Sequence, residues 1–222
     1  MCFSASASFA AAAVLVPAGI WTLGRAWNGD RRLLGLATFP LLFGVQQVSE
    51  GMLWRALDRG DVAGQQGPAL AFLFFAYFVW PFLVPLAAML AEHDPGRRRL
   101  LAWLSAAGLA LGLSLLVPLL IHADWMALRL ERASILYEPR LIWDGLVGHT
   151  PIRVVYAGII CGALLLSTDR DVRIFGGLIT ASVVLGFLFA AYAFVSIWCF
   201  FAALISLWIV VVVRRRQVPL VA

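Results

Sequence analysis

The sequence predicts an all-α, polytopic membrane helix bundle of about seven transmembrane helices, with the N-terminus outside and the C-terminus inside. The first observation is composition: of 222 residues, 63% are hydrophobic and 13% are charged, whereas soluble domains have about 45–50% apolar and about 25% charged residues. The second is that the apolar residues come in blocks of about 20, the length of a membrane-crossing helix. The third is that the basic residues cluster at the ends of these blocks.

The same composition excludes several other classes of protein. Strands of a membrane β-barrel would be about 10 residues long with alternating polarity, and that pattern is absent. All 17 basic residues are arginine, so a retinal Schiff base, which needs a lysine amine, is excluded. Three cysteines and three histidines are too scattered for a zinc finger. We read the arginines as topology signals and predict no nucleic-acid partner.

The first two predicted spans cover residues 7–27 and 33–57. No basic residue precedes the first span, whereas Arg25, Arg31 and Arg32 lie at or after its end. A secretory signal peptide has the opposite arrangement, with its positive charges first. We therefore expect an uncleaved first helix with its N-terminus outside.

The third, fourth and fifth spans are predicted at residues 69–91, 100–121 and 152–166. Pro81 and Pro85 lie inside the third span, where proline frees backbone carbonyls and kinks the helix. The next two spans each carry a Gly-x-x-x-Gly spacing, which lets helices approach closely. We therefore expect contacts with membrane-protein partners, or a homo-oligomer, through these small residues: Gly108, Gly112, Gly158 and Gly162.

The connection at about 122–151 is the longest between spans. Its short alternation of apolar and charged residues fits either a small hairpin or an interfacial helix, on the outer side. Trp125 and Trp143 would suit the headgroup layer. With no composition break elsewhere, residues 1–222 form a single predicted integral-membrane domain.

The final apolar tract, of about 40 residues, is too long for one span. We divide it near 192–195 into a sixth span at about 174–191 and a seventh at about 196–213. Three consecutive arginines follow directly at 214–216 and end the seventh span on the predicted inner side.

Counting arginines orients the bundle. With the N-terminus outside, eleven of the 17 fall in cytoplasmic segments and six fall outside, as the positive-inside rule requires. The cytoplasmic set is Arg25, Arg31, Arg32, Arg97, Arg98, Arg99, Arg170, Arg173, Arg214, Arg215 and Arg216. The outer set is Arg55, Arg59, Arg129, Arg132, Arg140 and Arg153.

The second span carries polar residues inside an apolar block. At about 100° per residue, one helix face holds Phe43, Gln46, Gln47, Glu50 and Trp54. A glutamate in hydrocarbon is costly unless it is protonated, partnered or beside a polar cavity. We predict an outer-leaflet pocket formed by Glu50, Gln46, Gln47 and Trp54. The alternatives are that Glu50 only links helices through amide hydrogen bonds and that Trp54 is an interfacial anchor.

Cysteine and histidine residues fall on the same predicted outer side. The topology places Cys2, His122 and His149 at the surface and Cys199 about one turn below it. Thiolate, imidazole and carboxylate groups bind copper, zinc and haem iron, so a transition metal or haem is one interpretation. A Cys2–Cys199 disulfide is the second, because an oxidising outer face permits it. The third places Cys199 in a small-residue packing stripe.

Five stretches form ordered blocks over nearly the whole chain: residues 1–9 (Met-Cys-Phe-Ser-Ala at the start), 40–54, 164–168, 172–176 and 196–203. They are similar to blocks of an uncharacterised bacterial family of multi-pass membrane proteins. The resemblance implies a bacterial inner-membrane location and assigns no activity or catalytic residue. Cys2, Glu50 and Cys199 fall inside these blocks.

Three functional hypotheses follow. The leading one is an inner-membrane protein whose outer-leaflet pocket around Glu50 binds a metal, cofactor or small molecule. The second is a non-catalytic accessory subunit that packs against a larger membrane complex. The third is an intramembrane enzyme with Cys2 or Cys199 as nucleophile, although no histidine base lies at helical spacing from either thiol.

Overall fold

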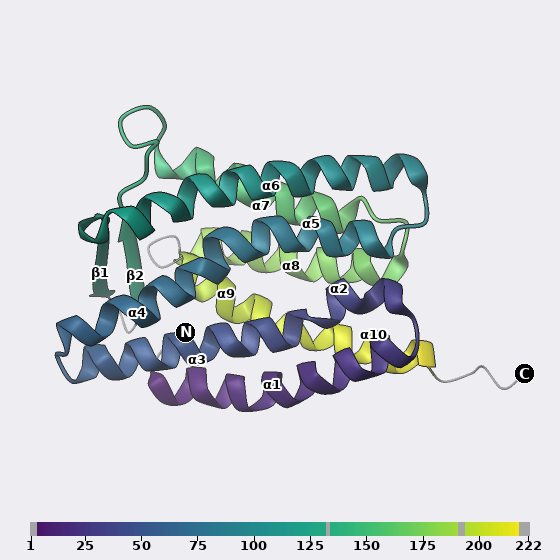
Figure 1. Ribbon diagram of the computed structural model, residues 1–222, viewed down its shortest axis with the longest axis horizontal. Coiled ribbons are helices and arrows are strands. Elements are labelled where there is room, and N and C mark those ends of the chain that lie inside the picture. Colours follow the sequence, from purple (N-terminus) through teal and green to yellow (C-terminus); the bar gives the residue numbers. More distant parts are fainter. Residues whose placement is uncertain (1–3, 132–133, 191–193, 218–222) are drawn as a thin grey trace, which may run out of the picture.

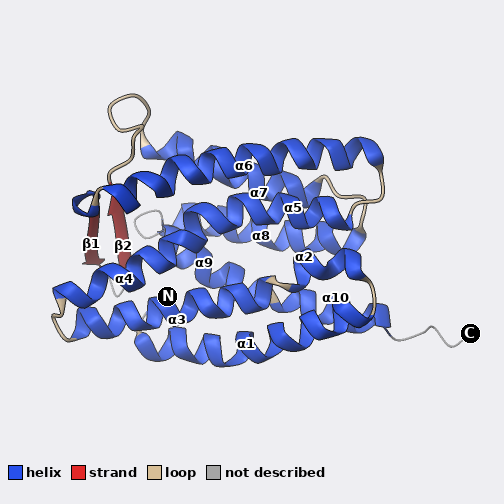
Figure 2. Ribbon diagram, viewed as in Figure 1, coloured by secondary structure: helices blue, strands red, loops and turns tan. Residues whose placement is uncertain are grey.

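The computed structural model describes residues 4–131, 134–190 and 194–217. Within these ranges the chain is a bundle of helices that run back and forth between two ends, with one pair of strands at one end (Figures 1 and 2). The all-α helical bundle predicted from the sequence is thus the observed fold, with a small sheet added.

Helices α1 (Ala5–Asn28) and α3 (Phe39–Asp58) pack antiparallel at close range. Glycines make this approach possible, because a Cβ on Gly19 would lie 2.5 Å from the Cα of Leu41 and one on Gly44 would lie 2.7 Å from a methyl group of Val16. The link between them contains η1 (Arg31–Leu33) and α2 (Leu34–Ala37). The second predicted span is therefore not one continuous helix.

After α3 the chain forms one long helical rod of three segments. They are α4 (Val62–Leu73), the π-helical segment η2 (Phe74–Val79) and α5 (Trp80–Ala91). Pro81 has no N–H, so a regular helical hydrogen bond to the Tyr77 carbonyl cannot form. Such a local break in the helical ladder suits a π segment at this point.

Helix α6 (Pro95–Ile121) lies against this irregular rod. A Cβ on Gly108 would come within 1.8 Å of the Pro81 carbonyl oxygen, and one on Gly112 would come within 2.9 Å of the Tyr77 carbonyl oxygen. These two glycines therefore pack against α5 and η2 of the same chain. The prediction that they form a surface for partners is wrong. Added Cβ atoms on Gly158 and Gly162 would meet nothing within 4 Å, so there is space beside these two glycines. A contact with a partner there stays a prediction.

The long connection holds η3 (Ala123–Trp125) and two antiparallel strands, β1 (Met126–Glu131) and β2 (Ser134–Pro139). Leu128 is paired with Tyr137. Strand β2 is mostly buried and β1 mostly exposed. The Tyr137 ring stacks on Phe72 of α4 with centroids 4.8 Å apart, so β2 covers this end of the bundle.

The last four helices are α7 (His149–Leu165), α8 (Arg170–Ala190), α9 (Phe194–Ile205) and α10 (Leu207–Gln217). Ser206 separates α9 from α10, and its Oγ donates a 2.6 Å hydrogen bond to the Ala203 carbonyl oxygen. A serine hydroxyl that bonds to a nearby carbonyl in this way competes with the helical ladder and bends helices. The seventh predicted span is thus two helices.

Five helical stretches in the described part of the chain are long and apolar enough to cross a membrane by length and composition: Ala5–Asn28, Val62–Ala91, Pro95–Ile121, Arg170–Leu188 and Phe194–Arg216. Helix α7 is apolar but only 17 residues long. Helix α3 has 20 residues and carries Gln46, Gln47 and Glu50. The count of seven spans and their orientation stay predictions.

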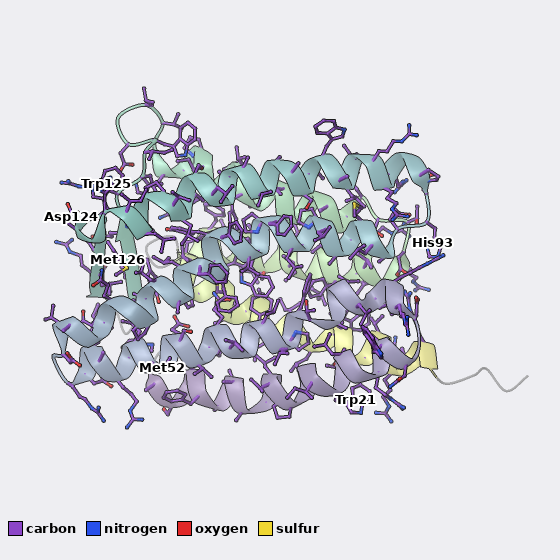
Figure 3. The ribbon with its side chains drawn as sticks, in the orientation of Figure 1. Trp21, Met52, His93, Asp124, Trp125 and Met126 are labelled. Carbon is purple, nitrogen blue, oxygen red and sulfur yellow. The ribbon has the colours of Figure 1, made fainter. Side chains whose placement is uncertain are left out.

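The two ends of the bundle differ in charge. One end, here called the arginine-rich end, contains the end of α1 with the α1–α2 link, the α5–α6 link with the start of α6, the α7–α8 link with the start of α8, and the end of α10 (Figure 1). All eleven arginines assigned to the cytoplasm belong to these segments. The other is the hairpin end. Figure 3 labels Trp21 and His93 toward the first end and Trp125 and Met126 at the second.

Candidate functional site

The polar residues of α3 lie inside the bundle. Gln46, Gln47 and Glu50 are each 0% exposed. Their spacing of three and four residues puts them on one side of the helix, and that side faces α5 and α9 rather than lipid. Burial of three polar side chains is costly unless each has partners, so their contacts define the site.

Glu50 links α3 to α9. The hydroxyl of Ser196 donates to Oε1 of Glu50 at 2.7 Å, and Nε2 of Gln47 donates to Oε2 at 3.3 Å. Both donors are neutral. Because Ser196 and Cys199 are three residues apart on α9, the bond to Ser196 also holds the Cys199 thiol near α3.

Gln46 links α3 to α5 and to the thiol. The indole Nε1 of Trp80 donates to Oε1 of Gln46 at 2.8 Å. Phe43, one turn earlier on α3, stacks on the Trp80 ring with centroids 3.7 Å apart. The side chain of Gln46 also interacts with Cys199. The amide thus sits between an aromatic stack and a buried thiol.

Trp54 lies elsewhere. Its ring is 5% exposed and packs in the apolar cluster beneath β2, with Leu53, Phe72 and Tyr137. It is therefore no lipid-facing interfacial anchor. None of the four predicted pocket residues, Gln46, Gln47, Glu50 and Trp54, is among the described residues that line the two cavities described next. Gln46 bonds to Trp80, which does line one of them.

Two cavities meet next to this polar cluster. The inner one has a volume of about 30 Å³ and is lined mainly by aromatic and aliphatic side chains, including Phe39, Phe43 and Trp80. The outer one has a volume of about 50 Å³ and extends toward the hairpin end. Their shared wall consists of Tyr156, Trp198 and Cys199. The ring of Tyr156 meets that of Trp198 edge-on, with centroids 5.4 Å apart.

Besides His149, which the sequence singled out as a possible metal ligand, the outer cavity carries polar groups that sequence reasoning missed. His149, Arg153 and Tyr156 line it from α7, and Tyr77 lines it from η2. The three α7 residues are spaced by four and three, so helical periodicity was the available signal. The hydroxyl of Tyr156 donates to the Ala76 carbonyl oxygen in the rod that the prolines interrupt.

Some buried polar atoms at this site have no hydrogen-bond partner in the described part of the chain. They include Nε1 of Trp198, which belongs to the shared wall, and Oε1 of Gln47. A buried polar group without a partner costs about 1–3 kcal/mol. Such atoms in a native structure call for an explanation, and a bound molecule is one.

The predicted metal ligands do not come together among the described residues, where no group of three or more His, Cys, Asp or Glu side chains could hold a metal ion. The His122 ring stacks on Trp125, and His149 pairs with Asp144 at 2.9 Å. Cys199 is a free buried thiol in the structure. Cys2 lies outside the described residues, so the ligand set and the disulfide that include it stay predictions.

The geometry does not favour Cys199 as a nucleophile. His149 lines the same outer cavity. It precedes Tyr156 by seven residues, however, which is about 10 Å along α7. Tyr156 shares the cavity wall with Cys199, so the imidazole is attached about two turns of α7 away from the thiol region. A general base must lie within hydrogen-bonding distance of the group whose proton it removes.

A second buried carboxylate, Glu92, lies at the arginine-rich end, in the α5–α6 link. Glu92 accepts hydrogen bonds from the backbone N–H groups of His93, Asp94 and Thr168, and from the Thr168 hydroxyl. Desolvation by burial opposes ionisation of Glu92, but these hydrogen bonds prevail and lower its pKa to about 2. Glu92 therefore joins the α5–α6 link to the α7–α8 link as a charged group.

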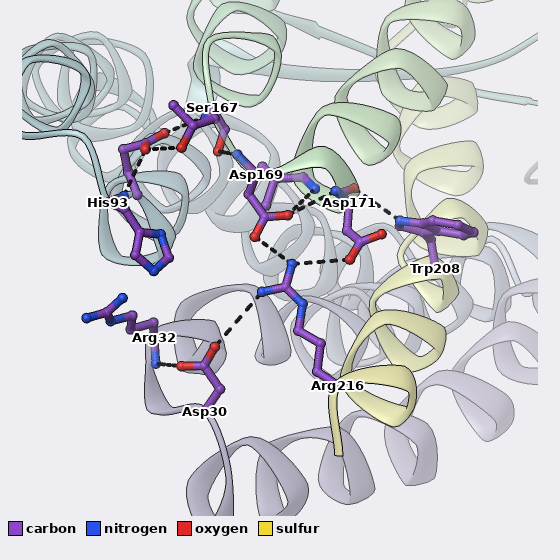
Figure 4. Close-up of polar contacts among 11 residues, drawn as sticks. Asp30, Arg32, His93, Ser167, Asp169, Asp171, Trp208 and Arg216 are labelled. Carbon is purple, nitrogen blue, oxygen red and sulfur yellow. Dashed lines mark hydrogen bonds and ion pairs between the residues drawn. The ribbon is translucent and has the colours of Figure 1, made fainter. Parts of the chain in front are cut away.

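Arg216 adds a further connection at this end. Its guanidinium lies 2.5 Å from Asp169, 3.2 Å from Asp171 and 3.9 Å from Asp30 (Figure 4). Although burial opposes ionisation of Asp169, the hydrogen bond and charge of Arg216 lower the pKa of that carboxyl. The end of α10 is thereby held to both the α1–α2 and the α7–α8 links.

Comparison with known proteins gives one match. No curated protein and no solved structure matches the chain. The model of a family of unknown function, DUF6629, matches residues 1–222. The match covers the blocks that suggested an uncharacterised family and extends over the whole chain, so the protein is a member of the DUF6629 family.

Proposed function

We propose that the protein is an integral membrane protein that binds a slender amphipathic molecule in the two joined cavities beside Glu50. One observation carries the proposal: the cavities share a wall of Tyr156, Trp198 and Cys199, and Nε1 of Trp198 is buried there without a partner in the described part of the chain. A ligand oxygen that accepts from this indole N–H would remove the cost of its burial.

The chemistry of the two cavities sets the class of ligand. The inner cavity offers aromatic and aliphatic walls, which favour an apolar chain. The outer cavity offers Arg153, His149 and Tyr77, which suit a head group that accepts hydrogen bonds or carries negative charge. Cavities of about 30 and 50 Å³ hold only a few non-hydrogen atoms, so a chain enters them only when the wall side chains move apart.

Glu50 serves this site as a positioning residue. Its bond to Ser196 holds α9 against α3, and the Gln46 bond to Trp80 holds α5 against the same face. The wall residues Trp198 and Cys199 belong to α9. The polar cluster therefore keeps the three helices at the separation that leaves the cavities open.

The orientation is part of the proposal. The concentration of eleven arginines at one end supports a cytoplasmic arginine-rich end and an outer hairpin end. The outer cavity would then open toward the external side of the membrane. The bacterial inner membrane is the location that the family resemblance favours.

The test is to identify what the protein retains. Full-length protein purified in mild detergent is examined by native mass spectrometry, and any bound molecule is extracted and identified. We expect a bound amphipathic molecule that is lost in Trp198→Phe, because phenylalanine keeps an aromatic ring and removes the N–H donor. The matched control is Trp103→Phe, since Trp103 is 76% exposed on α6 and remote from the cavity walls.

Two results would overturn the proposal. One is a wild-type protein that carries detergent and bulk lipid alone. The other is equal retention in Trp198→Phe, Trp103→Phe and the wild type, because the shared wall would then have no part in binding. A metal bound in stoichiometric amount and lost in Cys2→Ser would instead favour the cofactor interpretation.

A further inference from the structure

A second, separate recess lies at the arginine-rich end. It has a volume of about 390 Å³, larger than either interior cavity, and it is lined by Arg31, Arg32, Leu90, Glu92, His93 and Arg98. The residues come from the α1–α2 link, the end of α5 and the start of α6. Figure 4 shows the Arg32 guanidinium and the His93 ring directed toward the same space. Two distant links thus gather three guanidinium groups and an imidazole around one hollow.

The carboxylates near this recess are already occupied. Glu92 accepts four hydrogen bonds. Asp30 accepts from the Arg32 backbone N–H and lies 3.9 Å from Arg216. Asp94 caps α6 by accepting from the Arg97 backbone N–H at 2.7 Å. None of the three forms an ion pair with an arginine of the recess in the described part of the chain.

The guanidinium groups of the recess keep their donors available. Arg32 and Arg98 make no side-chain hydrogen bond or ion pair within the described residues. Arg31 uses only its Nε, which donates to the Trp27 carbonyl oxygen, and its guanidinium lies 5.0 Å from the Trp27 ring centroid. The recess therefore presents three guanidinium groups against one carboxylate, Glu92, whose oxygens are already engaged by four hydrogen bonds, so positive charge predominates.

The position of the recess matches the boundary between lipid and water. Trp27, beside Arg31, is 59% exposed, and Trp21, one and a half turns earlier on α1, is 40% exposed. Exposed tryptophans at the ends of membrane helices mark the headgroup layer. Leu90, at 40% exposure, gives the recess an apolar side. A phosphate of a lipid headgroup would meet the guanidinium groups at this depth.

We propose that this recess binds a phosphate-bearing anion, with Arg32 and Arg98 as the principal donors and Arg31 and His93 at its sides. Guanidinium groups match phosphate oxygens with paired, charge-assisted hydrogen bonds. The phosphate can belong to the headgroup of an anionic phospholipid or to a free phosphate of the aqueous side. The site is independent of the cavities beside Glu50.

The experiment compares a double variant of the recess with a matched control. Wild type, Arg32→Gln/Arg98→Gln and Arg173→Gln/Arg214→Gln are each reconstituted in nanodiscs of phosphatidylcholine with a minor fraction of phosphatidylglycerol. Both double variants lose two positive charges from the same end, but Arg173 and Arg214 do not line the recess. Retention of phosphatidylglycerol on release from the nanodisc is measured by native mass spectrometry.

We expect the recess variant to retain phosphatidylglycerol about a hundredfold more weakly than the wild type, since two arginines are lost and each charge-assisted bond is worth about one decade or more in affinity. The control should keep wild-type retention. Equal loss in the two double variants would overturn a specific site, and loss in neither would exclude a lipid headgroup as the bound anion. If the double variant fails to fold, Arg98→Lys, which keeps the charge but not the paired donors, should still weaken retention about threefold.

A second experiment distinguishes a lipid headgroup from a soluble phosphate as the bound anion. Protein in phosphatidylcholine nanodiscs is titrated with inorganic phosphate and with pyrophosphate, and binding heat is measured. Binding that depends on Arg32 and Arg98 assigns the recess to a soluble phosphate, whereas retention of phosphatidylglycerol without such heat assigns it to a lipid headgroup. Absence of both rejects the proposal while leaving the interior cavities untouched.

Discussion

Glu50 and Glu92 are both buried glutamates, at 0% and 3% exposure, yet their surroundings differ. Glu92 accepts four hydrogen bonds, three of them from backbone N–H groups of the α5–α6 and α7–α8 links. Glu50 accepts from the side chains of Ser196 and Gln47 in the middle of the bundle. The bonds of Glu92 thus come mostly from backbone at one end of the bundle, whereas these bonds of Glu50 come from a hydroxyl and an amide on helices in its interior.

This difference indicates which carboxylate stabilises the fold. Glu92 is stabilised as an anion, and its bonds join two links of the chain. Glu50 lies beside two cavities and beside polar atoms that lack partners in the described part of the chain, such as Nε1 of Trp198. We therefore expect Glu92 to matter for stability and Glu50 to matter for binding.

Replacement of Glu92 gives the largest expected effect. Glu92→Ala leaves the N–H groups of His93, Asp94 and Thr168 without their acceptor, so the free energy of unfolding should fall by about 3–4 kcal/mol. Denaturant unfolding in detergent micelles measures it. The control Glu138→Ala removes a 46% exposed carboxylate that lies 3.7 Å from Arg129, and it should change stability by less than about 1 kcal/mol. Equal losses would contradict the assignment.

Lowering the pH should remove the stabilisation by Glu92 in the wild-type protein as well. The pKa of Glu92 is about 2 in the folded state against 4.5 ordinarily. A lowered carboxyl pKa stabilises the folded state above the ordinary value, and this stabilisation is lost as the pH falls from about 5 through 2. The loss should reach about 3 kcal/mol, at about 1.4 kcal/mol per pKa unit.

The pH profile of Glu92→Gln tests this assignment, because an amide does not titrate. Its unfolding free energy should show a shallower acid dependence than the wild type over the same range. Asp169, whose pKa is also lowered, contributes the remaining slope in both proteins. Parallel profiles for the two proteins would assign the acid loss to other carboxylates.

Removal of the hydroxyl that bonds Glu50 should have an intermediate effect. Ser196→Ala deletes the 2.7 Å bond to Oε1 of Glu50, and we expect a loss of about 1–2 kcal/mol in unfolding free energy. The control Ser182→Ala removes a buried hydroxyl that donates within α8, to the Ile179 carbonyl oxygen. Thermal unfolding followed by circular dichroism compares them. If both changes cost the same, the bond between α3 and α9 adds nothing specific.

The smallest stability effect is expected for Glu50→Gln. Glutamine keeps the shape of the side chain and an acceptor for Ser196, so the unfolding free energy should change by less than about 1 kcal/mol. Retention of the bound molecule should nevertheless fall, since the amide alters the polar cluster beside the cavities. A stability loss as large as that of Glu92→Ala would mean that Glu50 is also an anchored anion.

Helix periodicity was sufficient to find the polar face of α3. Gln46, Gln47 and Glu50 stand out because an apolar block rarely carries them, and their spacing places them together. Trp198 was harder to interpret. Adjacent residues on a helix point about 100° apart, so helical geometry alone does not place it in the same wall as Cys199, yet it is 5% exposed and shares the cavity wall with Cys199. Neighbouring helices surround α9, so two adjacent residues are both buried.

The contacts of Glu92 were beyond sequence reasoning for a different reason. Thr168 lies 76 residues away, and its position beside Glu92 depends on how two helix pairs pack. The same holds for Tyr77 and Tyr156, which come from η2 and α7 and line the same outer cavity. Local patterns describe one helix at a time and do not specify which helices become neighbours.

The sequence by itself determined the class of protein, the approximate helices and the asymmetry of charge between the two ends, because hydrophobic length and arginine position are local properties. It also singled out Glu50. Only the tertiary structure decided that Gly108 and Gly112 pack inside the chain, that Trp54 lies away from the cavities, and that Arg32 and Arg98 meet at one recess. These outcomes depend on contacts between distant segments, which arise when side chains of several helices fill one shared volume.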